Sequence, residues 1–249
     1  MKLYHQKNQK KMRIILLCAG RSSRTNLGYP KCLYKFRDGE MLIEKNLKIL
    51  KKLGFLNKEI YFATGFKSKL IKTKTLNKYK YVFNNKFKTT NMVYSFNQVL
   101  KKVKPDETIV IYSDILFERK CLSKLIESNH SISTIIDKDW KKKWKKKSNF
   151  MDDLEELKIK NSKIYSLGKK TYDLKSIDGR FLGITKFSKK MINDLKKNLI
   201  SKILRQNKNI DFTNFLMQLI NKNFKVKAVS GKFNWHEFDN PKDFKIFKK

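Results

Sequence analysis

The sequence predicts an α/β fold, a mostly parallel sheet flanked by helices, with a small additional lobe. Short apolar runs rich in β-branched residues alternate with segments whose apolar residues recur at helical spacing. Such an alternation of strands and helices builds a sheet covered on both faces. No internal repeat and no linker rich in Pro, Gly or Ser divides the sequence, so residues 1–249 are expected to form one domain.

The first half of the chain supplies most of the expected sheet. Its strands are short apolar runs that end near Gly or small polar residues, as buried parallel strands do before a loop. The first helical segment carries Leu and Ile at helical spacing and is followed by Gly54, a typical helix stop. The expected strands are 12–18, 59–64, 80–83, 108–112 and 131–136, and the expected helices are 41–53, 91–102 and 122–128.

The second half is less regular. Between Trp140 and Lys147 the pattern breaks into Lys and Trp. Trp140 and Trp144, four residues apart, are typical of a packing stripe, although such a pair can also box an ammonium group. The other expected elements are two short strands within 157–167 about a turn at Asn161-Ser162, a strand at 181–187, helices at 189–203 and 212–222, and a last strand at 225–229.

The formal net charge of +37 is the most unusual feature of the composition. A strongly basic surface is common in nucleic-acid-binding proteins, which makes that class one alternative. The excess is nearly all Lys, however, and it is spread along the chain together with abundant Asn and Ile. Phosphate and base recognition favour the Arg fork. We therefore interpret the charge as compositional, expect no nucleic-acid partner, and expect polyanionic substrates such as triphosphates to be favoured.

Cysteine usage and hydropathy indicate a cytoplasmic protein without membrane insertion. The three cysteines form no C-x-x-C pair, which argues against a disulfide framework or a zinc site. No apolar run approaches the ~20 residues that span a bilayer. The apolar stretch 14–19 is too short for a signal peptide. The oligomeric state is left open.

The most specific chemical signal follows the first expected strand. The strand ends in a turn of small residues, whose backbone N–H groups can hold phosphate oxygens. Gly20 lets the main chain approach a ligand closely, and Arg24 and Lys31 would neutralise a triphosphate. The alternative is an ordinary turn with two surface cations. The segment reads Leu17-Cys18-Ala19-Gly20-Arg21-Ser22-Ser23-Arg24, with Pro30-Lys31 after it.

Acidic and amide side chains mark three further positions. Asp114 lies just beyond the strand 108–112, where open α/β sheets bind ligands, and a carboxylate suits Mg²⁺. Asp239 closes an aromatic and acidic cluster that begins at Trp235. Either acid could instead be a helix N-cap. Capping is also the default interpretation of Asn and Ser in the segment 84–95.

Taken together, these segments resemble the bacterial nucleotidyltransferase signature L-x-A-G-x-x-S/T-R followed by P-K. Over residues 12–244 the chain resembles the phosphocholine and aminophosphonate cytidylyltransferase branch, which is related to the sugar-phosphate nucleotidyltransferases. The resemblance implies a Rossmann-like, mixed and mostly parallel sheet flanked by helices, in a nucleotide-diphospho-sugar transferase-like fold. It also implies catalytic roles for Lys31, Arg24 and Asp114, and Mg²⁺ held by Asp114 and Asp239. The nucleotide contacts that it implies are Leu17, Ala19, Gly20, Arg21, Ser22, Ser23, Asn84, Asn91 and Ser95.

The same resemblance divides the chain into a nucleotide-binding core at 12–136, an acceptor lobe at 137–190, and a segment of helices with the second metal ligand at 191–249. Acids of the lobe would suit an acceptor that carries a cationic amine, although a solvated hairpin is an equal alternative. The acceptor-binding residues that it implies are Glu155, Gly183 and Glu237, in a region that also includes Asp152 and Asp153.

The implied reaction is transfer of CMP from CTP to a small phosphorylated or phosphonate acceptor, with release of pyrophosphate. Phosphocholine, 2-aminoethylphosphonate and other amino-alcohol or amino-acid phosphates fit, for the decoration of surface polysaccharide or lipid. The acceptor oxygen is anionic near neutral pH, so in-line attack on the α-phosphorus needs no general base. The alternatives are a sugar-1-phosphate nucleotidyltransferase, a basic nucleic-acid-binding protein, and a homologue that binds nucleotide without turnover.

Overall fold

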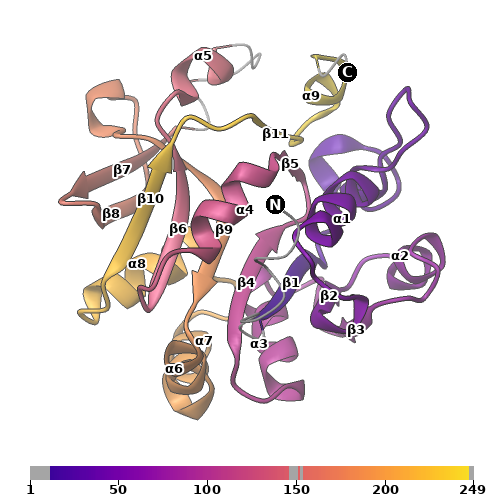
Figure 1. Ribbon diagram of the computed structural model, residues 1–249, viewed down its shortest axis with the longest axis horizontal. Helices are drawn as coiled ribbons and strands as arrows, with labels where there is room; N and C mark the ends of the chain where they lie inside the picture. Colours follow the sequence, from indigo (N-terminus) through magenta and orange to yellow (C-terminus); the bar gives the residue numbers. More distant parts are fainter. Residues whose placement is uncertain (1–11, 146–150, 152–153, 247–249) are drawn as a thin grey trace.

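The computed structural model describes residues 12–145, 151 and 154–246. Within them, nine strands form one sheet in the order β3–β2–β1–β4–β9–β6–β10–β8–β7 (Figure 1). A second, two-stranded sheet pairs β5 (Ile115–Phe117) with β11 (Trp235–Glu237). The strands of the large sheet are β1 (Met12–Cys18), β2 (Ile60–Thr64), β3 (Lys80–Phe83), β4 (Glu107–Tyr112), β6 (Ile132–Asp137), β7 (Glu155–Lys160), β8 (Lys163–Lys170), β9 (Arg180–Phe187) and β10 (Val226–Gly231).

The large sheet is mixed and mostly parallel, as the sequence predicts. Strands β1 to β4 pair in parallel, and so do β6 and β10. Strand β9 lies antiparallel between β4 and β6, and β8 lies antiparallel between β10 and β7. The carboxyl ends of β1, β4 and β6 therefore meet at one edge, which is also the edge where β9 begins.

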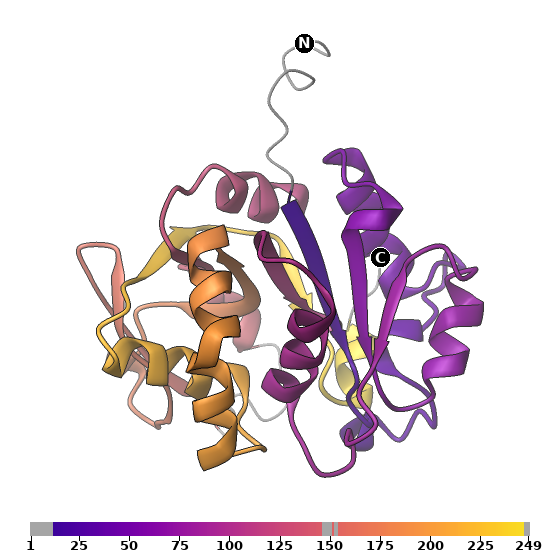
Figure 2. The same cartoon turned by 90° about the horizontal axis from the view of Figure 1, so that it is seen from below.

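Helices cover both faces because the side chains of each buried strand alternate between two cores. In β1, Ile14 and Leu16 belong to one core and Ile15 and Leu17 to the other. Figure 1 shows α1 and α4 on one face, and Figure 2 gives the view from below. The first core includes residues of α1 (Leu42–Lys52), α2 (Ser68–Lys74), α4 (Arg119–Ile126) and α5 (Trp140–Trp144), and the second includes residues of α3 (Met92–Lys102), α6 (Lys189–Asp194), α7 (Ile200–Gln206) and α8 (Phe212–Asn221).

The strands and helices expected from the sequence are present in the described residues. The expected helix 189–203 is a longer unit, in which a π-helical segment, Leu195–Leu199, joins α6 to α7. Five short α-helices and strands have no counterpart among the expected ones: α2, β5, α5, β11 and α9 (Pro241–Ile246). In the described part of the chain, no helix is long and apolar enough to cross a bilayer.

The expected acceptor lobe, 137–190, is divided between two places in the sheet. Strands β7 and β8 lie at one edge, where the turn at Asn161-Ser162 adopts positive φ at both residues. Strand β9 instead lies at the centre, hydrogen-bonded to β4 and β6. Residues 180–187 therefore belong to the same sheet as the core segment 12–136, rather than to a separate layer.

Candidate active site

A pocket of about 130 Å³ lies at the carboxyl ends of β1 and β4. Many residues predicted from the sequence meet there, and they come from the first loop, the start of α3 and the end of β4. Sequence reasoning did not single out several others as site residues. The predicted residues that line the pocket are Leu17, Ala19, Gly20, Ser22, Lys31, Asn91, Ser95 and Asp114, and those that it missed are Cys18, Pro30, Phe87, Thr90, Met92, Tyr112 and Ser113.

The loop after β1 folds back on itself and so brings Lys31 to the pocket. Ser22 is the pivot, because it adopts a left-handed conformation with φ 57°. Its hydroxyl accepts the Lys31 N–H at 2.9 Å, and its carbonyl accepts the Thr25 N–H at 3.1 Å. Arg21 and Ser23 are exposed on the same loop. Local hydrogen bonds thus explain why the motif residues 17–31 gather at one place.

Two cations and two carboxylates converge beside the pocket. Lys31 Nζ lies 2.9 Å from Asp114 Oδ2 and 3.2 Å from Asp239 Oδ1. Arg24 Nη2 lies 2.8 Å from Asp239 Oδ1. The side chains of Lys31 and Asp239 are only 11% and 10% exposed, whereas that of Arg24 is 65% exposed. The structure therefore unites the predicted catalytic residues and the predicted metal ligands in one charged cluster.

The carboxylates control the charge of Lys31. Burial lowers the pKa of an ammonium group, but the charges of Asp114 and Asp239 and the hydrogen bond to Asp114 together outweigh it. The pKa of Lys31 is consequently raised above its ordinary value. Lys31 is therefore a cation at neutral pH.

Asp114 and Asp239 are also the residues that could hold a divalent cation. Both direct a carboxylate oxygen toward the same ammonium group, so both reach one point in space. Among the described residues, no group of three His, Cys, Asp or Glu side chains forms a ready-made metal site. Mg²⁺ needs no such group, because it keeps several waters and is bound by one or two carboxylates together with substrate phosphates. The pair fits that ion.

The predicted Asn and Ser residues have two different positions. Asn91 lines the pocket and also caps α3, since its Oδ1 accepts the Met92 N–H at 2.8 Å. Asn84 is 1% exposed and is not among the pocket residues. Its amide donates to Ser95 Oγ and Thr90 Oγ1, both at 3.0 Å. Asn84 thus holds two hydroxyl groups that line the pocket.

Of the predicted acceptor residues, Gly183 lies against Tyr112, an aromatic residue at the end of β4 for which no role was predicted. Gly183 has φ +70°, and a Cβ built there would lie 2.4 Å from Tyr112 Cγ, so only Gly leaves room for the ring. Burial raises the pKa of Tyr112 well above its usual value, and nearby carboxylates add to the effect: Asp211, Glu155, Asp114 and Glu237. Gly183 therefore packs against the Tyr112 ring, and Glu155 and Glu237 act on Tyr112 through their charge. Asp152 and Asp153 lie outside the described residues.

The tryptophan pair packs in the core rather than forming an open cage. Trp140 and Trp144 are each 2% exposed, and Trp144 stacks on Trp235. The guanidinium of Arg180 lies 4.0 Å from the Trp144 ring centroid, and Arg180 Nη2 lies 3.7 Å from Glu237 Oε2. The packing interpretation of the pair is therefore confirmed, and its ring face is covered by a cation of the protein itself.

The candidate site lies at the carboxyl edge of a mostly parallel α/β sheet, the place where enzymes with open α/β sheets bind their ligands. Residues 14–156 match the model of the MobA-like NTP transferase domain. The CTP:phosphoglutamine cytidylyltransferase of Campylobacter jejuni subsp. jejuni serotype O:2 is 32% identical over 253 residues, which cover 94% of this chain and 98% of that protein. The chain therefore belongs to the MobA-like NTP transferase family and is a nucleotidyltransferase, which confirms the resemblance seen in the sequence.

Solved structures agree on the fold. The inositol-1-phosphate CTP transferase from T. maritima has a TM-score of 0.74 at 20% identity, over 95% of this chain and 92% of that one. A putative glucose-1-phosphate thymidylyltransferase from Bacillus anthracis scores 0.69 at 14% identity, over 94% and 93%. The CTP:phosphocholine cytidylyltransferase from Streptococcus pneumoniae scores 0.68 at 20% identity, over 95% and 97%. At these identities the likeness concerns the fold alone.

Proposed function

We propose that the chain is a magnesium-dependent cytidylyltransferase that transfers CMP from CTP to a small phosphorylated acceptor and releases pyrophosphate. The observation that carries the proposal is the cluster of Arg24, Lys31, Asp114 and Asp239 beside the pocket. The choice of CTP is supported by the relative at 32% identity, whose name gives CTP as its nucleotide. The product would serve the decoration of a surface polysaccharide or lipid.

The reaction is an in-line displacement at the α-phosphorus. An oxygen of the acceptor phosphate forms a bond to that phosphorus, while the bond to the bridging oxygen breaks and its electrons leave with pyrophosphate. The nucleophile is already anionic, so the protein contributes position and charge rather than a general base. Lys31 and Arg24 hold the oxygens of the departing pyrophosphate. Bound Mg²⁺, held by Asp114 and Asp239, would supply Lewis-acid neutralisation of phosphate charge.

The acceptor we propose carries an amine as well as a phosphate or phosphonate. That choice is supported by the relative at 32% identity, whose name gives phosphoglutamine as the acceptor. Phosphocholine, 2-aminoethylphosphonate and amino-alcohol or amino-acid phosphates share this chemistry. The phosphoglutamine named for the relative falls in the amino-acid group and is the first acceptor to test.

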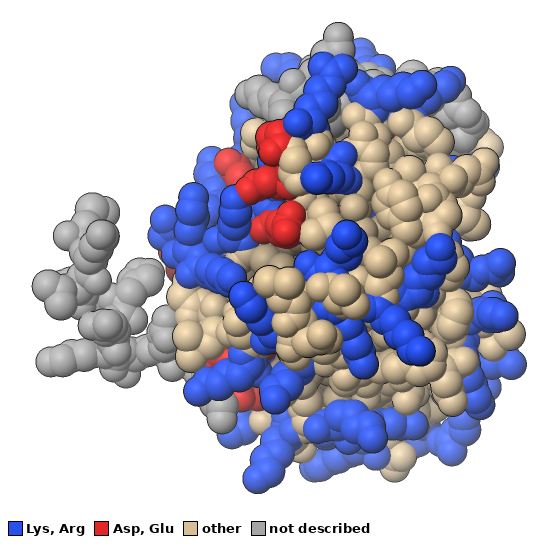
Figure 3. All heavy atoms as spheres, turned by 90° about the vertical axis from the view of Figure 1, so that its right-hand side faces the viewer, with Lys and Arg blue, Asp and Glu red and all other residues tan. Residues whose placement is uncertain are grey.

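The distribution of the basic side chains does not favour a nucleic-acid partner. Figure 3 shows Lys and Arg spread over one side of the molecule, with uncharged residues between them. A nucleic-acid interface is typically a contiguous basic stripe or patch. The spread is instead consistent with the compositional origin inferred from the sequence.

The test is pyrophosphate release in the presence of Mg²⁺, with each of the four ribonucleoside triphosphates against a panel of acceptors. The panel holds phosphoglutamine, phosphocholine, 2-aminoethylphosphonate and hexose 1-phosphates. We expect turnover with CTP and one amine-bearing acceptor, and its loss in Asp114→Ala. Turnover with a hexose phosphate alone would transfer the chain to the sugar-phosphate group. Absence of turnover across the panel, with salt-sensitive binding of DNA or RNA, would overturn the proposal.

A further inference from the structure

Asp243 is a buried acid that lies four residues beyond the proposed metal ligand Asp239. Asp243 is only 1% exposed. Its Oδ2 accepts the main-chain N–H groups of Asp239 at 2.8 Å and of Asn240 at 2.9 Å. Its Oδ1 has no hydrogen-bond partner within the described part of the chain. Burying a carboxylate oxygen in this way is unfavourable for stability, so the position requires an explanation other than stability.

Helix capping explains only part of these contacts. Helix α9 (Pro241–Ile246) begins with a reciprocal pair, in which Asn240 Oδ1 accepts the Asp243 N–H at 3.2 Å and Asp243 accepts the Asn240 N–H. That pair is a capping box, and it satisfies the helix start by itself. The bond from Asp243 to the Asp239 N–H is additional, and it fixes the peptide from which the Asp239 carboxylate projects.

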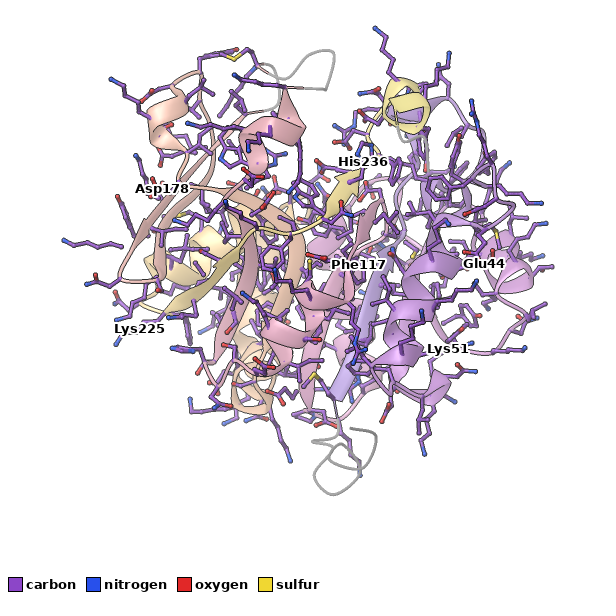
Figure 4. All side chains as sticks on the ribbon, turned by 45° about the horizontal axis from the view of Figure 1, so that its top comes forward. Glu44, Lys51, Phe117, Asp178, Lys225 and His236 are labelled. Atoms are coloured by element: carbon purple, nitrogen blue, oxygen red, sulfur yellow. The ribbon has the colours of Figure 1, made fainter. Side chains whose placement is uncertain are left out.

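The same segment is tied to its neighbours on both sides. His236, labelled in Figure 4 on β11, has its Nε2 3.0 Å from the main-chain oxygen of Asp243. Phe244 lies 3.9 Å from Tyr34 and 4.7 Å from Phe238, as measured between ring centroids. Tyr34 follows Lys31 by three residues. Packing of α9 therefore sets how far the Asp239 segment lies from the Lys31 segment.

We propose that Asp243 is a positioning residue for the transfer reaction. It holds the Asp239 main chain so that the Asp239 carboxylate reaches Lys31, Arg24 and the divalent cation that we expect beside them. Asp243 touches no substrate and acts through Asp239. The inference rests on the proposed function for the identity of the reaction, but its structural content concerns only where Asp239 is held.

The experiment compares four variants with the wild type by two measurements. The first is Mn²⁺ affinity, monitored by electron paramagnetic resonance with and without CTP. The second is the kcat and KM for CTP. We expect Asp243→Ala to weaken Mn²⁺ affinity and kcat/KM by about 10–100-fold, the usual effect of removing a group that orients a metal ligand. Asp243→Asn keeps an oxygen that can accept both N–H groups, so it should retain most of both quantities. Asn240→Ala removes the cap of α9 and should lower the melting temperature while leaving Mn²⁺ affinity near that of the wild type.

Asp243→Glu covers the case in which Asp243→Ala does not fold. Glu suits the same position of a capping box, so α9 should form, but the longer side chain shifts its oxygens away from the Asp239 N–H and should weaken Mn²⁺ binding. Wild-type Mn²⁺ affinity in both Asp243→Ala and Asp243→Glu would overturn the inference, and so would an equal loss in Asn240→Ala. Failure of the wild type to turn over CTP would instead overturn the proposed function, because the Mn²⁺ titration needs no turnover.

Discussion

The side-chain amide of Asn84 donates a hydrogen bond to Ser95 Oγ at 3.0 Å, from a position that is only 1% exposed. Ser95 lines the pocket, and so does Thr90, the second acceptor of that amide. Asn84 was expected to contact the nucleotide from the sequence pattern. In the structure Asn84 lies behind the pocket lining and holds two hydroxyl groups of that lining.

We expect Asn84→Ala to lower the free energy of unfolding by about 1–3 kcal/mol, because buried polar partners lose their hydrogen bonds. It should also raise the KM for CTP more than it lowers kcat. Denaturant unfolding and steady-state kinetics measure the two effects. Asn221→Ala, at an exposed position in α8, is the control and should stay within about 0.5 kcal/mol of the wild type. Equal stability of Asn84→Ala and Asn221→Ala would contradict the role of Asn84 in holding the two hydroxyl groups.

Lys31→Met should lower kcat by about 100–1000-fold, the size expected when one preorganised group that stabilises transition-state charge is removed. The change also leaves Asp114 and Asp239 without the ammonium that they share. Pyrophosphate release at saturating CTP measures it. Lys142→Met is a matched control, because that side chain is 84% exposed on α5. A kcat near that of the wild type in Lys31→Met would remove Lys31 from the catalytic group.

The raised pKa of Lys31 has a consequence for stability at high pH. A cation whose folded pKa exceeds its unfolded value of 10.5 contributes fully below pH 10.5, and the contribution is lost as the pH rises through the folded pKa. The difference in unfolding free energy between the wild type and Lys31→Met should therefore be constant from about pH 7 to 9 and shrink above pH 10.5. Denaturant titrations of both proteins across this range provide the measurement. A difference in unfolding free energy that grows above pH 10.5 would contradict the raised pKa of Lys31.

Gly183→Ala should destabilise the protein and raise the KM for the acceptor, since its Cβ would lie 2.4 Å from the Tyr112 ring. Gly39 is the matched control, because it also has positive φ, at +83°, but the nearest atom to its Cβ would be Lys35 Cε at 3.9 Å. We expect Gly183→Ala to lose about 1–3 kcal/mol more than Gly39→Ala, which is the cost of the overlap alone. Thermal unfolding of both variants measures it. Equal losses would show that the ring moves freely.

Local patterns were enough to predict most elements and the first loop. Residues 14–18 are a continuous apolar run, which a strand buried on both faces requires. Ser22 and Lys31 are nine residues apart, so one hydrogen bond closes their loop. Tyr112, in contrast, has the sequence context of the last apolar residue of a strand, and only its place in the pocket lining, against Gly183, marks it as part of a site.

The alternation of strands and helices and the small-residue turn after β1 could be predicted, because each depends on neighbours a few positions away. Local patterns could not reveal that β9 lies between β4 and β6, or that Asp239 meets Lys31 across 208 positions of sequence. Strand order, and ion pairs between residues so far apart in sequence, depend on how the whole sheet and helix α9 bury their apolar faces. The free energy of that burial belongs to the assembled core and leaves no periodic signal in any one segment.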